Sequence, residues 1–202
     1  MARLSREGRA PDRAATEAAL ERAALELLDR NGVLAGLNLR EVAAEAGVNR
    51  GLVYHYFGSR RDLLRAALGS DVRERMHDLA QATHGGLRNR FANFFRTMLG
   101  HRRAVVLSAL LVLDGDRDVR FDVDATRRRR RFALSIERGE APEGLDGDAY
   151  WVATSSLIYG YGIFRTRFAE ELGLDPDELD ERVLATVDRL IAGLASQPAP
   201  TA

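Results

Sequence analysis

Two short helix segments joined by a tight turn, between residues 38 and 60, constrain the fold of this chain more than any other feature. An asparagine with a glutamate three positions later is close to a capping box and predicts the start of a helix over about 40–46. Gly47 ends that helix, and Asn49 is placed to cap a second helix over about 50–56. Two short helices separated in this way have the geometry of a helix-turn-helix.

The charge around the second of these helices is one-sided. Between Gly47 and Arg61 the sequence has no carboxylate, but it has three arginines and one histidine. The chain as a whole carries 30 basic and 30 acidic residues, so its formal net charge of +0 gives no general attraction for nucleic acid. A local excess of cations suits DNA phosphates, and we therefore expect the second helix to lie on DNA.

Helical periodicity continues through the rest of the chain, and alternating strand-like runs are missing. Apolar spacing predicts a first helix over Arg13–Asn31, and the sequence Asp-Pro-Asp-Glu at 175–178 is a strong start signal for the last one. A long helix is expected over 148–172, and another from a turn at 114–116 to about Arg138. With 46% hydrophobic residues to fill a core, the pattern predicts an all-α fold of about nine helices.

Composition and motifs argue against several classes of protein. The chain has no cysteine, which excludes disulfides, thiolate metal sites and a cysteine nucleophile. No nucleophile elbow, phosphate loop, paired-carboxylate spacing or metal-binding histidine spacing occurs, so we expect no enzymatic activity, no cofactor and no metal. The longest apolar run, 104–113, is too short to span a bilayer, and the arginine-rich start lacks the apolar block of a signal peptide. A cytoplasmic protein without membrane contact is expected.

Three runs of residues carry a family resemblance: Val-Ala-Ala-Glu-Ala-Gly-Val at 42–48, Gly-Leu-Val-Tyr-His-Tyr-Phe at 51–57 and Ser-Arg-Arg-Asp-Leu at 59–63. Through them, residues from about 13 to 68 resemble the N-terminal domain of the tetracycline-repressor (TetR) family of transcriptional regulators. The resemblance implies a transcriptional regulator, in such families most often a repressor, that binds double-stranded operator DNA. The residues expected to contact this DNA are Asn38, Arg40, Asn49, Arg50, Gly51, Leu52, Tyr54, His55 and Arg60.

The resemblance also suggests what some of these residues do. Tyr54 matches a tyrosine of the family that commonly contacts phosphate, and Arg60 matches a lysine often found at the start of the following helix. Leu52 departs from the family, which often has threonine there, so an apolar contact to a thymine methyl is possible instead of a polar one. Arg50 can pair with guanine through two hydrogen bonds, although about half of the contacts in such interfaces go to the DNA backbone.

In the family that this chain resembles, the last two helices form a four-helix bundle with a second subunit. A homodimer is also expected on physical grounds, because one short recognition helix contacts too few bases for tight specific binding. A two-fold dimer implies a palindromic operator. Small side chains at positions 153, 155, 156, 160 and 162 would let another helix approach the long helix.

The resemblance further implies that the middle helices enclose a pocket for a small-molecule effector. For each candidate residue, plain core packing is the alternative. The candidates are mostly apolar, which favours an apolar effector. They are Phe91, Phe94, Phe95, Met98, Leu107, Leu110, Leu111, Trp151 and Tyr159.

These inferences divide the chain into a flexible basic arm (1–12), a helix-turn-helix domain (13–60), a helical ligand-binding and dimerisation domain (61–197) and a tail (198–202). Five consecutive arginines at 127–131 are either a second nucleic-acid patch or, as we favour, an exposed helical stretch whose stems cover apolar surface. We expect a dimeric regulator that a small effector releases from its operator. The alternative is a helical ligand-binding or interaction protein that does not use its helix-turn-helix for regulated DNA binding.

Overall fold

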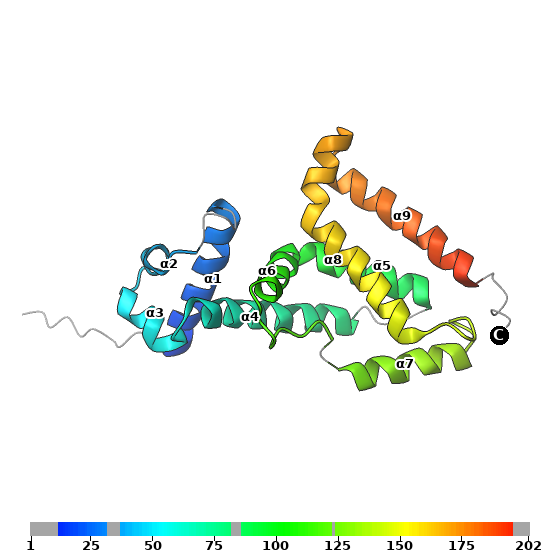
Figure 1. Ribbon diagram of the computed structural model, residues 1–202, viewed down its shortest axis with the longest axis horizontal. Helices are drawn as coiled ribbons and strands as arrows, with labels where there is room; N and C mark the ends of the chain where they lie inside the picture. The colour runs from blue at the N-terminus through cyan, green and yellow to red at the C-terminus, as the bar shows by residue number, and fades with distance from the viewer. Residues whose placement is uncertain (1–11, 32–36, 82–85, 123, 196–202) are drawn as a thin grey trace, which may run out of the picture. The chain divides into compact units, whose positions relative to one another are not determined.

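The computed structural model of this protein describes residues 12–31, 37–81, 86–122 and 124–195, with the main chain alone for 71–81 and for Ala195. Within these ranges the chain forms nine α-helices and no strand, which confirms the predicted all-α fold (Figure 1). The helices are α1 (Arg13–Asn31), α2 (Leu39–Glu45), α3 (Arg50–Phe57), α4 (Arg60–Gln81), α5 (Leu87–Gly100), α6 (Arg102–Leu113), α7 (Ala125–Glu137), α8 (Gly147–Leu172) and α9 (Pro176–Ala195). None of these helices, as far as they are described, is long and apolar enough to cross a membrane. The predicted tail and nearly all of the predicted arm lie outside the described residues.

Contacts divide the chain into two compact units, one up to Ser70 and one from Asp71 onwards, so the boundary falls inside α4. In the first unit α1 packs against α2, and α2 packs against α3. The apolar side chains buried in this unit are Leu20, Ala23, Ala24, Leu27, Leu37, Val42, Ala43, Val53, Leu63, Leu64, Ala67 and Leu68. Three helices that are too short or too polar to stand alone thus share one core with the start of α4.

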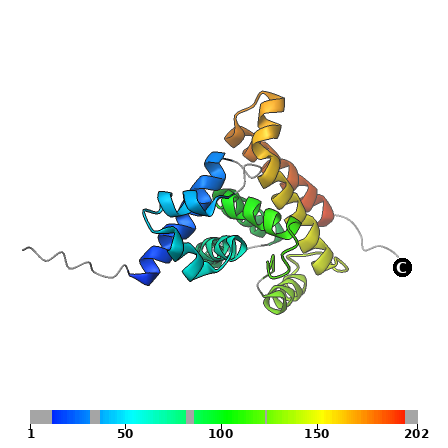
Figure 2. The same ribbon diagram turned by 60° about the vertical axis from the view of Figure 1, so that its left-hand side comes forward.

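In the second unit α8 is the central helix, because it contacts α5, α6, α7 and α9 (Figures 1 and 2). The core is built on three stacked aromatic rings. The ring centroid of Phe95 lies 5.9 Å from that of Phe91 and 5.5 Å from that of Tyr161. Around these rings pack Leu87, Met98, Val105 and Ile158 together with the α9 side chains Leu179, Leu184, Val187 and Ile191.

Small residues on α8 face different neighbours. Gly162 is buried against α6, and a Cβ atom at this position would lie 3.2 Å from Val105 Cγ1. Ser155 is also buried, whereas Ala153 and Ser156 are exposed. The helix that packs closely against Gly162 is therefore α6 of the same chain and not a helix of a second subunit.

Polar side chains fix α8 against α9. Arg165 donates from Nε to Asp180 Oδ1 and from Nη2 to Asp180 Oδ2, both at 2.7 Å. The Tyr161 hydroxyl donates to Asp180 Oδ1, also at 2.7 Å. Burial, helped by the hydrogen bond to Asp180, raises the pKa of Tyr161, so the phenol keeps its proton and remains a donor. We call these three residues the α8–α9 clamp.

The start of α7 differs from the prediction of a helix directly after the turn at 114–116. The helix begins only at Ala125, because aspartates upstream bind main-chain N–H groups in local turns. Asp116 accepts the N–H two residues later at 2.8 Å, and Asp124 caps α7 by accepting the Arg127 N–H at 2.8 Å. Aspartate competes for the backbone in this way, and the helical pattern of the apolar residues did not reveal it.

Candidate nucleic-acid interface

α2 and α3 meet at a tight turn. Gly47 has φ +68°, in the left-handed region that favours glycine. The turn closes where the Val48 N–H donates to the Ala43 carbonyl at 2.9 Å. Val42 on α2 and Val53 on α3 are both buried beside it. These contacts give the predicted helix-turn-helix its turn and its small core.

Side-chain caps set the residues at which the two helices begin. Asn38 Oδ1 accepts the Arg40 N–H at 2.9 Å, and Asn38 Nδ2 donates to Glu41 Oε1 at 3.3 Å. At α3, Asn49 Oδ1 accepts the Gly51 N–H at 2.8 Å. A Cβ atom on Gly51 would lie 3.3 Å from Asn49 Oδ1, so the glycine makes room for this cap. Both capping oxygens are engaged, and the two asparagines can approach phosphate only through their amide N–H groups.

The outward side of α3 is exposed. Arg50, Gly51, Tyr54 and His55 all lie on it, while Leu52 is half-buried. The Arg50 guanidinium carbon lies 5.5 Å from the centroid of the Tyr54 ring, and Arg50 Nη2 lies 3.4 Å from the Tyr54 hydroxyl. This stacking holds the guanidinium along the helix surface, where its planar donors can reach phosphate or a base edge.

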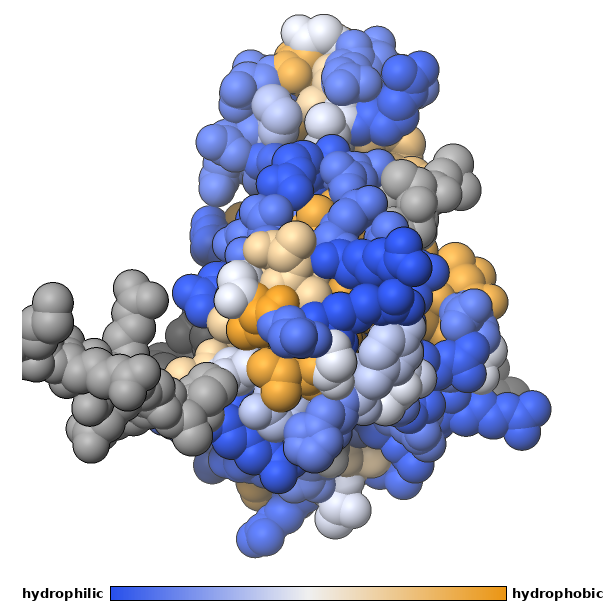
Figure 3. All heavy atoms as spheres, turned by 90° about the vertical axis from the view of Figure 1, so that its left-hand side faces the viewer, coloured by the Kyte–Doolittle hydropathy of each residue, from blue (hydrophilic) through white to orange (hydrophobic). Residues whose placement is uncertain are grey.

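Further cations flank α3. Arg40 on α2 and Arg60 at the first position of α4 are exposed. α4 begins with a cap in which Ser59 Oγ accepts the Asp62 N–H at 3.1 Å. The space-filling view from the side on which α2 and α3 lie in Figure 1 shows a mainly hydrophilic surface with small apolar areas (Figure 3). Such a surface suits a hydrated, charged partner more than an apolar one.

The carboxylate nearest the turn in the sequence is neutralised within the unit. Glu45, the last residue of α2, pairs with Arg30 of α1 through two hydrogen bonds of 3.0 and 3.2 Å. These bonds hold the pKa of Glu45 below its ordinary value. The pair joins α1 to α2, and it also reduces the repulsion that a free carboxylate would exert on a polyanion.

The residues predicted to line an effector pocket all lie in the second unit. Phe91, Phe95, Met98, Leu107 and Leu111 are buried, whereas Phe94, Leu110, Trp151 and Tyr159 are half-buried. The stacked phenylalanines of this set belong to the aromatic core around α8. Their contact with a ligand remains a prediction.

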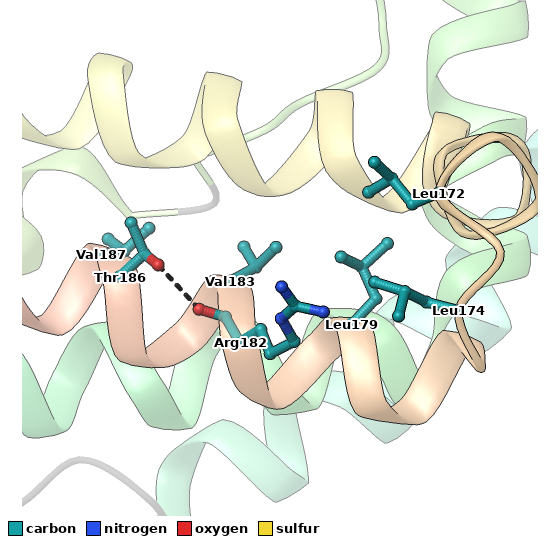
Figure 4. Close-up of a pocket in the computed structure, with 7 residues that line it drawn as sticks. All are labelled: Leu172, Leu174, Leu179, Arg182, Val183, Thr186 and Val187. Carbon is teal, nitrogen blue, oxygen red and sulfur yellow. Dashed lines mark hydrogen bonds between the residues drawn. The ribbon is translucent and has the colours of Figure 1, made fainter.

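Two surface grooves of the second unit are lined by other residues. One, of about 340 Å³, lies at the turn between α8 and α9 and is lined by Leu172, Leu174, Leu179, Arg182, Val183, Thr186 and Val187 (Figure 4). The other, of about 390 Å³, lies at the start of α5, where Arg88 forms an ion pair with Asp188 of α9. Neither groove could be predicted from the sequence, because each depends on how distant segments of the chain meet.

The arginine run on α7 is largely engaged with its own chain. The Arg128 guanidinium lies 4.7 Å from the centroid of the Trp151 ring and pairs with Asp122 at 2.7 Å. Asp148 of α8 accepts ion pairs from Arg128 at 2.9 Å and from Arg129 at 2.7 Å. These contacts support a helical stretch that packs its stems on the protein, as we favoured over a second nucleic-acid patch.

Comparison with known proteins gives two kinds of match. Residues 20–67 match the model for bacterial regulatory proteins of the tetR family. No curated protein matches the sequence. Among solved structures, a protein from Rhodococcus sp. assigned to the TetR-family transcriptional regulators superposes with a TM-score of 0.65 at 19% identity, over 88% of this chain and 99% of that one. A protein from Pseudomonas aeruginosa assigned as a transcriptional regulator gives 0.59 at 24% identity, over 89% of this chain and 91% of the other. BioQ from Mycobacterium smegmatis gives 0.57 at 19% identity, over 88% of this chain and 98% of the other.

Proposed function

We propose that this chain is a DNA-binding transcriptional regulator of the TetR family, and that it acts as a cytoplasmic homodimer that represses genes from a palindromic operator. In this proposal a small, largely apolar effector releases the dimer from the DNA. The nine residues named above, from Asn38 to Arg60, form the surface that meets the DNA.

The outward face of α3 carries this proposal. It joins a rigidly capped helix to an exposed cation, Arg50, and an exposed phenol, Tyr54, on a stretch of chain without acidic residues. In a protein of zero net charge, this local arrangement is what attracts and orients a polyanion. The stacked guanidinium is suited to phosphate or to the two acceptors of guanine, and the phenol is suited to phosphate.

An apolar face on α8 and α9 supports dimerisation. Six of the eleven large apolar side chains that are exposed among the described residues belong to these helices, namely Val152, Phe164, Phe168, Leu172, Leu190 and Leu194. The rings of Phe164 and Phe168 lie one turn apart, with centroids 6.0 Å from each other. Exposed apolar side chains in such number are what an interface with a second copy of the chain would cover.

Release by an effector requires a difference between two states of the dimer. A ligand lowers DNA affinity only if it binds more tightly to a conformation whose two α3 helices do not fit successive half-sites. The half-sites of a two-fold dimer lie about one helical turn of DNA, or a multiple of it, apart. The second unit supplies the helices that a ligand would have to move.

DNA binding is tested with the double variant Arg50→Ala, Tyr54→Ala. Fluorescence anisotropy with DNA from the region flanking the gene should show affinity that falls steeply with salt. We expect the double variant to bind about tenfold or more weakly, because each contact of this type contributes about 1–3 kcal/mol. Arg22→Ala is the matched control, since Arg22 is an exposed arginine on α1 of the same unit, outside the helix-turn-helix.

Two results would overturn the proposal in different ways. Unchanged binding by the double variant would mean that α3 is not the recognition helix. Absence of DNA binding by the wild-type protein at any salt concentration would favour a helical ligand-binding or interaction protein that does not use its helix-turn-helix.

A further inference from the structure

One buried hydroxyl in the second unit lacks the hydrogen bond that comparable groups make. Five polar side chains are buried among the described residues. Four of them are paired: Thr16 with the Asp12 carbonyl, Ser108 with the Ala104 carbonyl, Ser135 with the Arg131 carbonyl, and Asp116 with the Asp118 N–H. Ser155 on α8 is 8% exposed, and its Oγ has no partner. Such an orphan costs free energy, and each case in a native fold calls for an explanation.

Thr154 competes with Ser155 for the carbonyl that a helical serine would normally use. A buried helical serine ordinarily donates to the carbonyl four residues earlier, which here belongs to Trp151. The single hydroxyl proton of Thr154 is shared between the Tyr150 carbonyl at 2.7 Å and the Trp151 carbonyl at 3.2 Å. The helical N–H of Ser155 takes the remaining lone pair. The free hydroxyl of Ser155 is therefore left to a group from outside the helix.

The surroundings of Ser155 indicate the chemistry of such a group. Trp151 and Tyr159 lie one turn before and one turn after Ser155, on the same side of α8. Arg128 covers the Trp151 ring, and the ring of Phe121 meets that of Tyr159 edge-on at 5.0 Å. Two aromatic side chains thus frame the hydroxyl, and two further side chains from outside α8 lie over them.

The charges described near Ser155 are already balanced, which favours a neutral ligand. Arg128 is the cation nearest this stretch of α8 in the contacts described above, and its guanidinium is already paired with Asp122 and Asp148. The positive charge of Arg128 therefore needs no carboxylate from a ligand to balance it. Phe121 is 43% exposed and follows the end of α6 in a segment without helix, so a ligand that packs on Tyr159 would have to displace this one ring.

We propose that Ser155 is the polar contact of the effector site, and that the effector is a neutral, largely apolar or aromatic molecule with one hydroxyl or carbonyl group. This inference rests on the proposed function, because it places on α8 the effector that the regulator is proposed to sense. The apolar part of the molecule packs between Trp151 and Tyr159, and its oxygen exchanges a hydrogen bond with Ser155 Oγ. A group able to hydrogen-bond then selects this ligand over a pure hydrocarbon of the same size.

The first test compares Ser155→Ala with Ser156→Ala in the ligand-free protein. Both variants gain the same helix propensity, but only Ser155 is buried, since Ser156 is exposed. Removal of an unpaired buried hydroxyl should raise the Tm of Ser155→Ala above that of Ser156→Ala by about 2–4 °C. A Ser155→Ala variant that melts at or below the Tm of Ser156→Ala would show that the hydroxyl holds only a buried water, and this would overturn the proposal.

The second test uses intrinsic fluorescence, because Trp151 is the single tryptophan of the chain and lies next to the site. Benzyl alcohol and toluene serve as probes that differ by one hydroxyl. We expect both to change the fluorescence of Trp151 in the wild-type protein. Ser155→Ala should weaken the binding of benzyl alcohol about threefold to tenfold and leave the binding of toluene unchanged. Ser156→Ala should change the affinity for neither probe.

The outcomes separate this inference from the proposed function. No response of Trp151 to either probe, or an equal response of wild type and Ser155→Ala to both, would overturn the site. If the wild-type protein still bound operator DNA with a steep salt dependence in that case, the regulator proposal would stand and only the location and chemistry of the effector site would be wrong.

Discussion

Gly47 and Gly58 have left-handed backbone at the two ends of α3, the helix proposed to recognise DNA. Their φ angles are +68° and +70°, and a Cβ atom at either position would meet no other atom within 4 Å. A side chain there strains the backbone without causing a clash, so the effect of a substitution reports backbone conformation alone. Since the turn at Gly47 sets the angle between α2 and α3, strain at this residue also bears on DNA binding.

We expect Gly47→Ala to lower the free energy of unfolding by about 1–2 kcal/mol and to weaken binding to DNA. Urea unfolding followed by circular dichroism measures the first effect, and anisotropy with labelled DNA measures the second. Gly100→Ala is the control, because Gly100 ends α5 with no neighbour within 4 Å and no positive φ. Alanine should be neutral or slightly stabilising there. Equal losses for the two variants would contradict the backbone argument.

Asp148 in the first turn of α8 gives the chain a defined acid response. Hydrogen bonds from Arg129 and Arg128 lower the pKa of Asp148 to about 2. This folded-state pKa lies below the value of about 3.9 for an unfolded chain, so the ionised carboxylate stabilises the fold above about pH 4. The contribution is lost as the pH falls toward 2. Thermal melts should therefore show that Asp148→Asn has a lower Tm than wild type near neutral pH. The difference in Tm should disappear between about pH 4 and 2. A difference that does not change with pH would refute the stabilising role of the ionised Asp148 carboxylate.

At the scale of the element, helix ends were predictable where a cap is local. The helix predicted over 40–46 is found at Leu39–Glu45, and the one predicted over 148–172 is found at Gly147–Leu172. Each starts after a side chain that binds N–H groups two or three residues later, and short-range chemistry of this kind can be recognised in the sequence. The start of α7 was missed because aspartates upstream each bind a main-chain N–H group in a local turn, which the apolar pattern does not show.

The exposed face of the candidate interface was predictable because it follows from local helical periodicity, but its side-chain contacts were not. Periodicity alone places Arg50 and Tyr54 on the outward face of α3, and the structure exposes both. Their stacking, the Arg30–Glu45 pair and the orphan hydroxyl of Ser155 depend on rotamers and on contacts between distant segments. No pattern in a single sequence carries that information.

The α8–α9 clamp shows how much an element pair can depend on one buried ion pair. The side chains of Arg165 and Asp180 are each only 16% exposed. Arg165→Met leaves the Asp180 carboxylate with Tyr161 alone, which we expect to lower the free energy of unfolding by about 3 kcal/mol. Arg167→Ala is the control on the same helix, because Arg167 is 68% exposed and pairs only with Glu170 and Glu171. Its loss should cost at most about 0.5 kcal/mol by urea unfolding; similar losses for both variants would show that the clamp is not special.

For the whole molecule, zero net charge means that specific DNA binding depends on where the cationic side chains are placed. Two copies of α3 on a two-fold dimer double the local cationic surface without changing the net charge of either chain. The second half-site is then bound at a high effective concentration, so occupancy of a palindrome exceeds what one α3 provides. In the proposed function, dimerisation through α8 and α9 and operator binding through α3 are therefore coupled energetically, although they belong to different units.

The double variant Phe168→Glu, Leu190→Glu tests this link. Both side chains are exposed, at 44% and 63%, so the substitutions should leave the folded chain intact while placing charge on the apolar face of α8 and α9. Sedimentation velocity should show a monomer at micromolar concentration, and affinity for a palindromic operator should fall about a hundredfold or more. Leu113→Glu is the control, because Leu113 at the end of α6 is 84% exposed and lies outside that face. A double variant that stays dimeric would move the interface elsewhere, and a monomer that kept full operator affinity would show that one α3 is sufficient for recognition.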